Sequence, residues 1–465
     1  MAEQAVGQPG AQQINLLKVL GPVHVWALGV GIVLVGEFMG WNYAVGKGGA
    51  YGALIAAWVI GLLYTCVAMI DSEITSTVAA AGGQYAQAKH TTGPLMAFNV
   101  GLYLVLAYTM LEAGDVLVAG QLIQIGAAEL GANVAFEPFT VLCIAILAWL
   151  NYRGVFMTLT VNFVITAAAF VSILILFVGL EPWNPGAFLK HTELLTDLPY
   201  GWLGVLAAFH FGIWYYLGIE GTCQAAEEVR SPGRSLPLGT MTGMITLLIA
   251  AGLTWYVCVG MLPWEYLGWD LTLAPLFDAA RVSGSTSLHV ILFVGTLFSA
   301  IASANGTIND AARAWFSMGR DRYLPQWFGA VHPRYRTPFR SILFLIPIAA
   351  VFALKVPLAQ VITFSILSGL LEYTFMPINM FKFRRKWPIG SIRRGYEHPF
   401  HPLPAIVLLV LCIATFFAVY LGYGRQLLAM MAFYIVASLW FAYYRYKFVR
   451  RGDQFTMAWP RPLGY

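Results

Sequence analysis

Twelve long apolar runs limit what this chain can fold into. A helix that crosses a bilayer needs about 20 apolar residues, and most of the runs approach or exceed that length. Of the 465 residues, 59% are hydrophobic and 11% are charged, whereas soluble domains carry roughly 25% charged residues. We therefore predict an all-α polytopic membrane protein with twelve transmembrane helices. The runs cover residues 20–45, 50–72, 95–126, 136–151, 155–180, 202–224, 238–262, 287–311, 338–354, 358–381, 402–422 and 427–447.

The basic residues are distributed unevenly over the segments that join these runs. If both termini lie inside, 22 of the 27 Lys and Arg residues fall on the inner side. An excess of Lys and Arg marks the cytoplasmic side of a membrane protein. We therefore predict a plasma (cytoplasmic) membrane protein with cytoplasmic N- and C-termini. The five outer residues are Lys47, Lys190, Arg281, Lys355 and Arg425.

Two glutamates occupy matching positions five spans apart. Glu37 in the first span lies between Gly36 and Gly40, and Glu220 in the sixth lies between Gly218 and Gly221. Interrupted helices at corresponding positions of two halves are typical of transporters built from inverted repeats. Alternatively, the glycines only allow close helix packing.

Three further stretches carry a family resemblance. The chain reads Gly218-Ile-Glu-Gly, then Ala226-Glu-Glu-Val-Arg-Ser-Pro-Gly-Arg-Ser-Leu-Pro-Leu-Gly239, after the sixth span. It reads Gly319-Arg-Asp-Arg-Tyr-Leu-Pro325 after the eighth span and Ala81-Gly-Gly-Gln-Tyr85 after the second. Over about residues 23–385 these stretches resemble the amino acid–polyamine–organocation (APC) superfamily of permeases. Within it, Gly36-Glu-Phe-Met-Gly-Trp-Asn42 looks most like the ethanolamine permease branch.

The resemblance implies a five-plus-five inverted-repeat (LeuT-like) fold. In that fold helices 1 and 6 are unwound at mid-membrane, and the substrate binds between them and crosses by alternating access. The expected division is a cytoplasmic tail at 1–19, a first repeat at 20–180, a second repeat at 200–386, peripheral helices at 400–447 and a second cytoplasmic tail at 448–465.

The chain departs from many proton-coupled members of this superfamily in the fifth span. Those members carry a lysine three residues after a threonine. In this chain Thr166 is followed by three alanines, so that Ala169 stands at the lysine position. The coupling ion, proton or sodium, therefore stays open.

Glu37 is the most informative residue for the substrate. A charge at mid-membrane costs at least about 2.5–3.5 kcal/mol on insertion scales, so Glu37 needs a partner or a cavity. A cationic amine supplies the partner, whereas an amino acid brings a repulsive carboxylate. We expect a secondary active transporter for a small, ethanolamine-like amine, with an amino acid permease as the alternative. A structural hydrogen bond inside the bundle is the other role open to Glu37.

The remaining candidates follow from the same reasoning. Aromatic rings beside the breaks can hold an ammonium, and Glu112 and Asp115 lie three apart on one helix face. Ser303 is a candidate ion ligand, and Asp71 and Glu73 are expected at the membrane interface. We expect Glu227 and Glu228 to stabilise the inner end of helix 6 with Arg230 and Arg234, and to form a gate with Arg320 and Asp321. The predicted substrate-binding residues are Gly36, Glu37, Gly40, Trp41, Glu112, Phe209, Trp214, Gly218, Glu220 and Glu372.

Other function classes find little support in the sequence. It contains no HExxH motif, P-loop or serine-nucleophile elbow, so we expect no enzyme, no catalytic residue and no cofactor. The five cysteines form no CxxC pair, so we expect no metal site. The basic run at 381–394 reads as a solvated loop, and no nucleic acid partner is expected. A sensor or channel is the remaining rival, and neither explains the paired glycine–glutamate interruptions.

Overall fold

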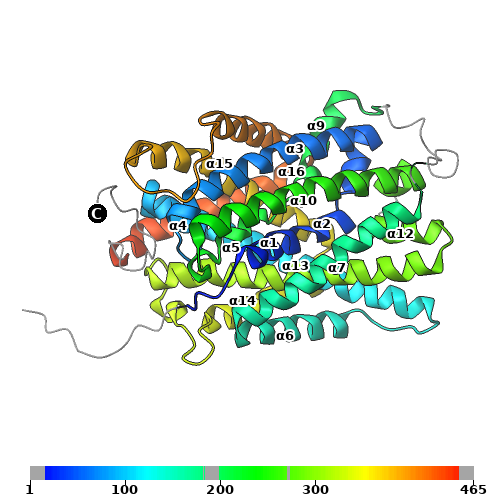
Figure 1. Ribbon diagram of the computed structural model, residues 1–465, viewed down its shortest axis with the longest axis horizontal. Helices are drawn as coiled ribbons and strands as arrows, with labels where there is room; N and C mark the ends of the chain where they lie inside the picture. Colours follow the sequence, from blue (N-terminus) through cyan, green and yellow to red (C-terminus); the bar gives the residue numbers. More distant parts are fainter. Residues whose placement is uncertain (1–15, 182, 184–197, 270–272, 450–465) are drawn as a thin grey trace, which may run out of the picture.

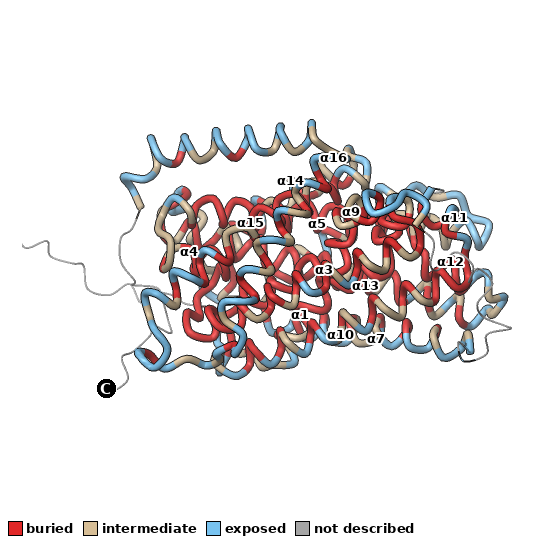
Figure 2. The backbone as a smooth tube through the Cα atoms, turned by 90° about the horizontal axis from the view of Figure 1, so that it is seen from above, coloured by how far each residue is buried: buried red, intermediate tan, exposed pale blue. Residues whose placement is uncertain are grey.

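The computed structural model describes residues 16–181, 183, 198–269 and 273–449. Long helices lie side by side along the longest axis of the molecule (Figure 1). Buried residues fill the interior of this bundle, and exposed residues gather at its ends and outer faces (Figure 2). The helices are α1 (Pro22–Val33), α2 (Val35–Phe38), α3 (Tyr43–Thr77), α4 (Gln84–Thr91), α5 (Pro94–Glu129), α6 (Glu137–Arg153), α7 (Val155–Gly179), α9 (Gly201–Gly212), α10 (Pro232–Met261), α11 (Trp264–Gly268), α12 (Pro275–Val282), α13 (Thr286–Arg320), α14 (Phe339–Lys355), α15 (Leu358–Lys386) and α16 (Leu403–Trp440).

Short 3₁₀ and π turns complete this set of helices. They are η2 (Ile213–Tyr215), η3 (Ile219–Cys223), η4 (Ala226–Glu228), η5 (Gln326–Gly329), η6 (Phe441–Arg445) and η7 (Tyr446–Phe448). Several of the long helices begin at a proline in their first turn, as at Pro94 and Pro232. Proline suits this position because the first-turn N–H groups have no partner within the helix.

Among the described residues, eight helices are long and apolar enough to cross a membrane. The other predicted spans differ from these for local reasons. The first is broken into α1 and α2, α6 and α14 have 17 residues each, and α16 joins the last two spans through non-helical backbone at Tyr423. The predicted all-α polytopic fold is therefore confirmed, with the span limits adjusted at these places.

The last part of the chain lies apart from the bundle interior. After Tyr423 the helix runs along one side of the molecule, mostly exposed (Figure 2). Tyr434 and Phe441 are the two buried residues of the segment 424–449. Most of the two predicted tails, residues 1–15 and 450–465, lies outside the described residues.

The outer faces of the bundle are apolar. Large hydrophobic side chains are exposed on the peripheral helices, including Leu142 at 56%, Val164 at 59% and Ile413 at 60%. In water such a surface would be a site of association. In this chain it matches the predicted lipid partner, because hydrocarbon accepts apolar side chains from helices whose backbone bonds are satisfied internally.

Candidate functional site

The first predicted span is interrupted after α2. Met39 is extended (φ −154°, ψ 157°), and Gly40 has φ +84°, which glycine adopts at little cost. The Asn42 side chain holds the interruption: its Oδ1 accepts from the Gly40 N–H at 3.2 Å, and its Nδ2 donates to the Leu267 carbonyl at 2.8 Å. The helix then resumes at Tyr43. The interruption expected at Gly36–Gly40 therefore begins after Phe38.

The sixth span is interrupted in the same way. α9 tightens into the turn η2, and Gly218 then adopts φ +114° before η3 begins. The Glu220 carboxylate accepts from the Gly218 N–H at 3.1 Å, which stabilises this turn. The predicted break at Gly218–Gly221 thus coincides with a backbone that leaves the α-helix.

The two interruptions pack against each other because Gly36 and Gly40 have no side chain. A Cβ at Gly36 would overlap the Trp214 carbonyl oxygen. A Cβ at Gly40 would lie 2.5 Å from Trp214 Nε1, which is too close for two such atoms. The glycines of the first break therefore allow the second break to approach it closely. This packing is the physical reason for the glycines on both sides of Glu37.

Unpaired polar atoms gather where the breaks meet. Both carboxylate oxygens of Glu37 are buried without a hydrogen-bond partner in the described part of the chain, as are Trp41 Nε1, Trp214 Nε1 and Tyr215 OH. The rings of Trp41 and Tyr215 are stacked, with centroids 5.5 Å apart, and the charge of Glu37 acts on Tyr215. Each unpaired buried group costs about 1–3 kcal/mol. Acceptors and donors left open together form a surface that a small polar ligand can satisfy.

Three further predicted site residues lie elsewhere around the breaks. Glu220 faces α15, where Tyr373 OH donates to its Oε1 at 2.8 Å. Glu372, the neighbour of Tyr373 on α15, is buried and lies within electrostatic range of Glu220. Phe209 is partly buried and packs against the main core from α9. Their predicted contact with substrate stays a prediction.

Glu112 and Asp115 form a separate group on α5. Both carboxylate oxygens of Glu112 are buried and lack a hydrogen-bond partner among the residues the structure describes, whereas Asp115 contacts Ser303 of α13. Electrostatic contacts join both to Cys143 of α6. No described contact joins Glu112 to Glu37, so that a substrate contact of Glu112 also stays a prediction.

Ser303 of α13 lies against the first span, as the ion-site hypothesis requires. Its hydroxyl donates to the Ile32 carbonyl at 2.6 Å and so ties α13 to α1. The Ser303 side chain also contacts the Asp115 carboxylate of α5. The role of Ser303 as an ion ligand stays a prediction.

An asparagine network centres on Asn305, which the sequence offered with Ser303 as a candidate ion ligand, but its partners Asn162 and Asn151 were missed. Asn162 donates to the Ala27 carbonyl of α1 at 3.2 Å and accepts from Asn305 of α13 at 3.2 Å. Asn305 in turn accepts from Asn151 of α6 at 2.8 Å. Neutral amides therefore join α7 to α1 and α13. This is the span in which Ala169 stands where many proton-coupled members of the superfamily have a lysine. A run of polar residues in an apolar span was the available signal.

Ion pairs close the end of the bundle that follows the interruption of the sixth span, after η3. Arg320 donates to both oxygens of Glu227 at 3.0 and 2.9 Å, and Arg313 pairs with Glu228 at 2.5 Å. Asp321 binds Lys89 of α4 at 2.9 Å. The expected contact between the glutamates and Arg320 is therefore present, and Arg313 is a partner of Glu228 that the sequence did not indicate. The expected contribution of Arg230 and Arg234 stays a prediction.

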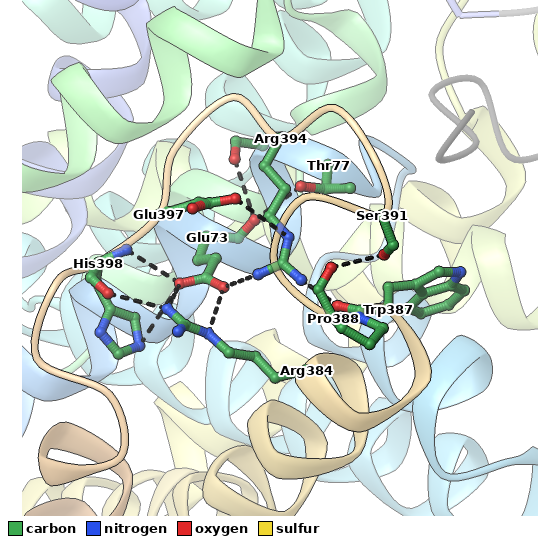
Figure 3. A network of polar contacts seen from close by, with 10 residues as sticks. Glu73, Thr77, Arg384, Trp387, Pro388, Ser391, Arg394, Glu397 and His398 are labelled. Carbon is green, nitrogen blue, oxygen red and sulfur yellow. Dashed lines mark hydrogen bonds and ion pairs between the residues drawn. The ribbon is translucent and has the colours of Figure 1, made fainter. Parts of the chain in front are cut away.

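A second ion-pair network surrounds Glu73 at the end of α3 (Figure 3). Arg384 donates to its two oxygens at 2.9 and 2.6 Å, and Arg394 donates at 2.5 Å. The His398 N–H donates at 3.0 Å. Glu73 and Asp71 are both 0% exposed, so that these side chains are enclosed by protein. Their expected depth at the membrane interface stays a prediction.

Comparison with known proteins agrees with this geometry. A bundle of apolar helices in which two interrupted helices meet at a buried carboxyl group is typical of membrane transporters. The family model "Amino acid permease" matches residues 19–451. The chain therefore belongs to this family of the APC superfamily and is a transporter, not an enzyme.

The relatives are transporters too. An uncharacterized transporter of Rhizobium meliloti is 67% identical over 100% of both chains. The methylthioribose transporter of Bacillus subtilis is 26% identical, over 86% of this chain and 88% of its own. The branched-chain amino acid permease BcaP of the same organism is 23% identical, over 93% and 94%.

Proposed function

We propose that the protein is a secondary active transporter for a small organic amine of the ethanolamine type. The observation that carries this proposal is the set of buried atoms without partners around Glu37: two carboxylate oxygens, two indole N–H groups and one phenol. We further propose that residues 20–180 and 200–386 are the two repeats that rearrange during alternating access.

An amino alcohol matches these atoms in type. Its ammonium can donate to Glu37, and its hydroxyl oxygen can accept from the N–H of Trp41 or Trp214. An ammonium over an aromatic face gains roughly 0.5–2 kcal/mol, and Trp41 and Tyr215 supply such faces. Because Glu37 is 0% exposed, the surrounding side chains have to move when a ligand enters.

An amino acid is the second candidate. Its carboxylate could accept from the indole N–H groups, but it would also repel Glu37. The relatives' names favour this candidate in part, since they include a branched-chain amino acid permease and the "Cationic amino acid transporter 4, vacuolar" of Arabidopsis thaliana. The methylthioribose transporter shows that the names do not agree on one substrate.

Competition in proteoliposomes distinguishes the two candidates. We expect purified protein to exchange labelled ethanolamine against internal ethanolamine, and unlabelled ethanolamine to compete about tenfold better than alanine or putrescine, which corresponds to about 1.4 kcal/mol. Empty liposomes are the control. If alanine or glycine competes better than ethanolamine, the amino acid candidate replaces the amine.

We also propose that the protein lies in the cytoplasmic membrane with both termini inside. Arg334, exposed in the segment after α13, and Ala132, exposed after α5, fall on opposite sides in this topology. We expect an impermeant maleimide to label Ala132→Cys in intact cells, and Arg334→Cys only after permeabilisation. The native cysteines are buried or partly buried, and the wild type provides the blank. Labelling of Arg334→Cys in intact cells would reverse the orientation.

A further inference from the structure

Four buried carboxylates from four different elements lie around the interruption of the sixth span, between α9 and η3. They are Asp71 of α3, Glu220 of η3, Asp310 of α13 and Glu372 of α15, and each is at most 1% exposed. Electrostatic contacts link them: Glu372 interacts with Glu220 and Asp71, and Asp310 interacts with Glu220. The substrate proposal rests on Glu37 and gives no role to Asp71 and Asp310, while a substrate contact of Glu220 and Glu372 stays a prediction.

Hydrogen bonds connect two of the carboxylates into one network. Gln84 of α4 donates both to Asp71 at 2.6 Å and to the Glu220 carbonyl at 3.1 Å. Tyr373 donates to the Glu220 carboxylate at 2.8 Å and itself accepts from Tyr64 at 3.1 Å. The network therefore reaches from α3 and α4 across η3 to α15.

The other two carboxylates are only partly satisfied. Glu372 Oε1 and Asp310 Oδ2 are buried without a hydrogen-bond partner in the described ranges. Asp310 lies against the broken helix, since a Cβ at Gly221 would overlap its Oδ2. Tyr108 of α5 also belongs to this group: its side chain is 1% exposed, lies within electrostatic range of all four acids and contacts the Glu220 carboxylate. The two carboxylate oxygens without partners, Glu372 Oε1 and Asp310 Oδ2, indicate that something besides these side chains belongs at this place.

Within the described ranges, one basic side chain acts on these acids. Arg313 is the base that acts on Asp310, but it already binds Glu228 at 2.5 Å and the Asn309 carbonyl at 3.0 Å. Buried carboxylates that interact in a low dielectric repel each other when both are ionised, and a bound proton removes this repulsion. Six other titratable groups lie within electrostatic range of the four acids. They are Tyr64, Tyr108, Tyr373, Cys223, Cys412 and Glu228.

We propose that Asp71, Glu220, Asp310 and Glu372 form a proton-binding site that couples proton entry to substrate entry. This inference rests on the proposed transport function and names its coupling ion. Glu220 is carried by the broken helix, whereas Glu372 and Asp310 are carried by α15 and α13. When the broken helix moves during alternating access, the distances between these acids change, and with them the affinity for the proton. The proton is bound from the outside and released inside, with the substrate, and no other bond forms or breaks.

The test separates exchange from accumulation in proteoliposomes. We expect wild-type protein to accumulate labelled ethanolamine when the outside is acidic, and not under an inward sodium gradient. In Asp310→Asn and Asp71→Asn, the ratio of pH-driven accumulation to counterflow should fall about tenfold or more. Glu129→Gln is the matched control: this carboxylate is exposed at the end of α5, where it binds His289 at 2.9 Å, and both activities should be kept.

Each outcome bears on one proposal. If the wild type shows no counterflow with ethanolamine, alanine or putrescine, the proposed function fails. If it shows counterflow but accumulates substrate only with sodium, or if both variants keep the wild-type ratio, the proton site is rejected. Should one variant fail to fold, as judged by size-exclusion chromatography, the other supplies the same ratio. Should both fail, the pH dependence of wild-type accumulation decides.

Discussion

Replacing Glu73 with glutamine should destabilise the folded protein strongly. The change leaves Arg384 and Arg394 without their shared counter-charge, and the Arg394 side chain is 1% exposed. Removing one partner of a buried ion pair costs about 3–5 kcal/mol, because the remaining charge stays buried. We expect the unfolding midpoint of Glu73→Gln in detergent to fall by several degrees.

Glu397 provides the control for this prediction. Its carboxylate lies 3.7 Å from Arg394 and its side chain is 38% exposed, so that Glu397→Gln removes a charge of the same type at little cost. A second variant, Glu73→Gln with Arg394→Met, removes one of the stranded charges and should recover part of the loss. If Glu73→Gln melts with the wild type, the network in Figure 3 does not stabilise the fold.

The same network should weaken in acid. Burial lowers the pKa of His398 to about 4 from its ordinary value of 6.5, so that the folded protein favours the neutral imidazole. A group whose folded pKa is depressed contributes its stability above the unfolded pKa. For His398 this contribution is therefore complete above about pH 6.5 and decreases as the pH falls towards 4. At neutral pH the two arginines alone balance Glu73.

The broken helices could be predicted from the sequence because their cause is local. Glycines beside a glutamate in an otherwise apolar span indicate a helix that cannot continue through lipid, and Gly40 and Gly218 adopt the positive φ that only glycine takes readily. The role of Gly36 was harder to see. It remains helical, and it matters because Trp214, far away in the sequence, packs its backbone carbonyl there.

Polar pairing could not be predicted in the same way. The partners of Glu73, Arg384 and Arg394, lie more than 300 positions along the chain, and the basic run that holds them offers several arginines. Arg320 was expected near Glu227 and pairs with it, whereas nothing in the sequence indicated that Arg313 of α13 would pair with Glu228. Such choices depend on which helix ends meet, and apolar periodicity does not contain this information.

The span limits show a similar division. The apolar runs predicted where membrane helices lie, but not that α3 continues through Gly49, whose φ of +73° separates the first two predicted spans. They also did not predict that the last two spans would join at Tyr423 with almost no loop. Short connections carry too few residues to register as breaks in hydropathy.

Exchanging Glu37 for glutamine should cause the largest loss of transport. The substitution keeps the shape of the side chain and removes the charge that an ammonium would need, because a buried carboxylate and a bound cation offset each other's desolvation only when both are present. We expect ethanolamine counterflow to fall about tenfold or more, the equivalent of at least about 1.4 kcal/mol. The fold should survive, since an uncompensated charge is removed and none is created.

Two measurements separate this role from a structural one. Ethanolamine should raise the melting temperature of the wild type, as ligands that bind the folded state do, and should leave that of Glu37→Gln unchanged. Glu112→Gln is the comparison, because it removes an equally buried carboxylate that also lacks a partner in the described chain. A loss of similar size there would mean that α5 lends a second acid to recognition. If Glu37→Gln keeps transport within a few-fold of the wild type, and alanine competes better than ethanolamine in both proteins, Glu37 is a packing residue and the substrate is a zwitterion.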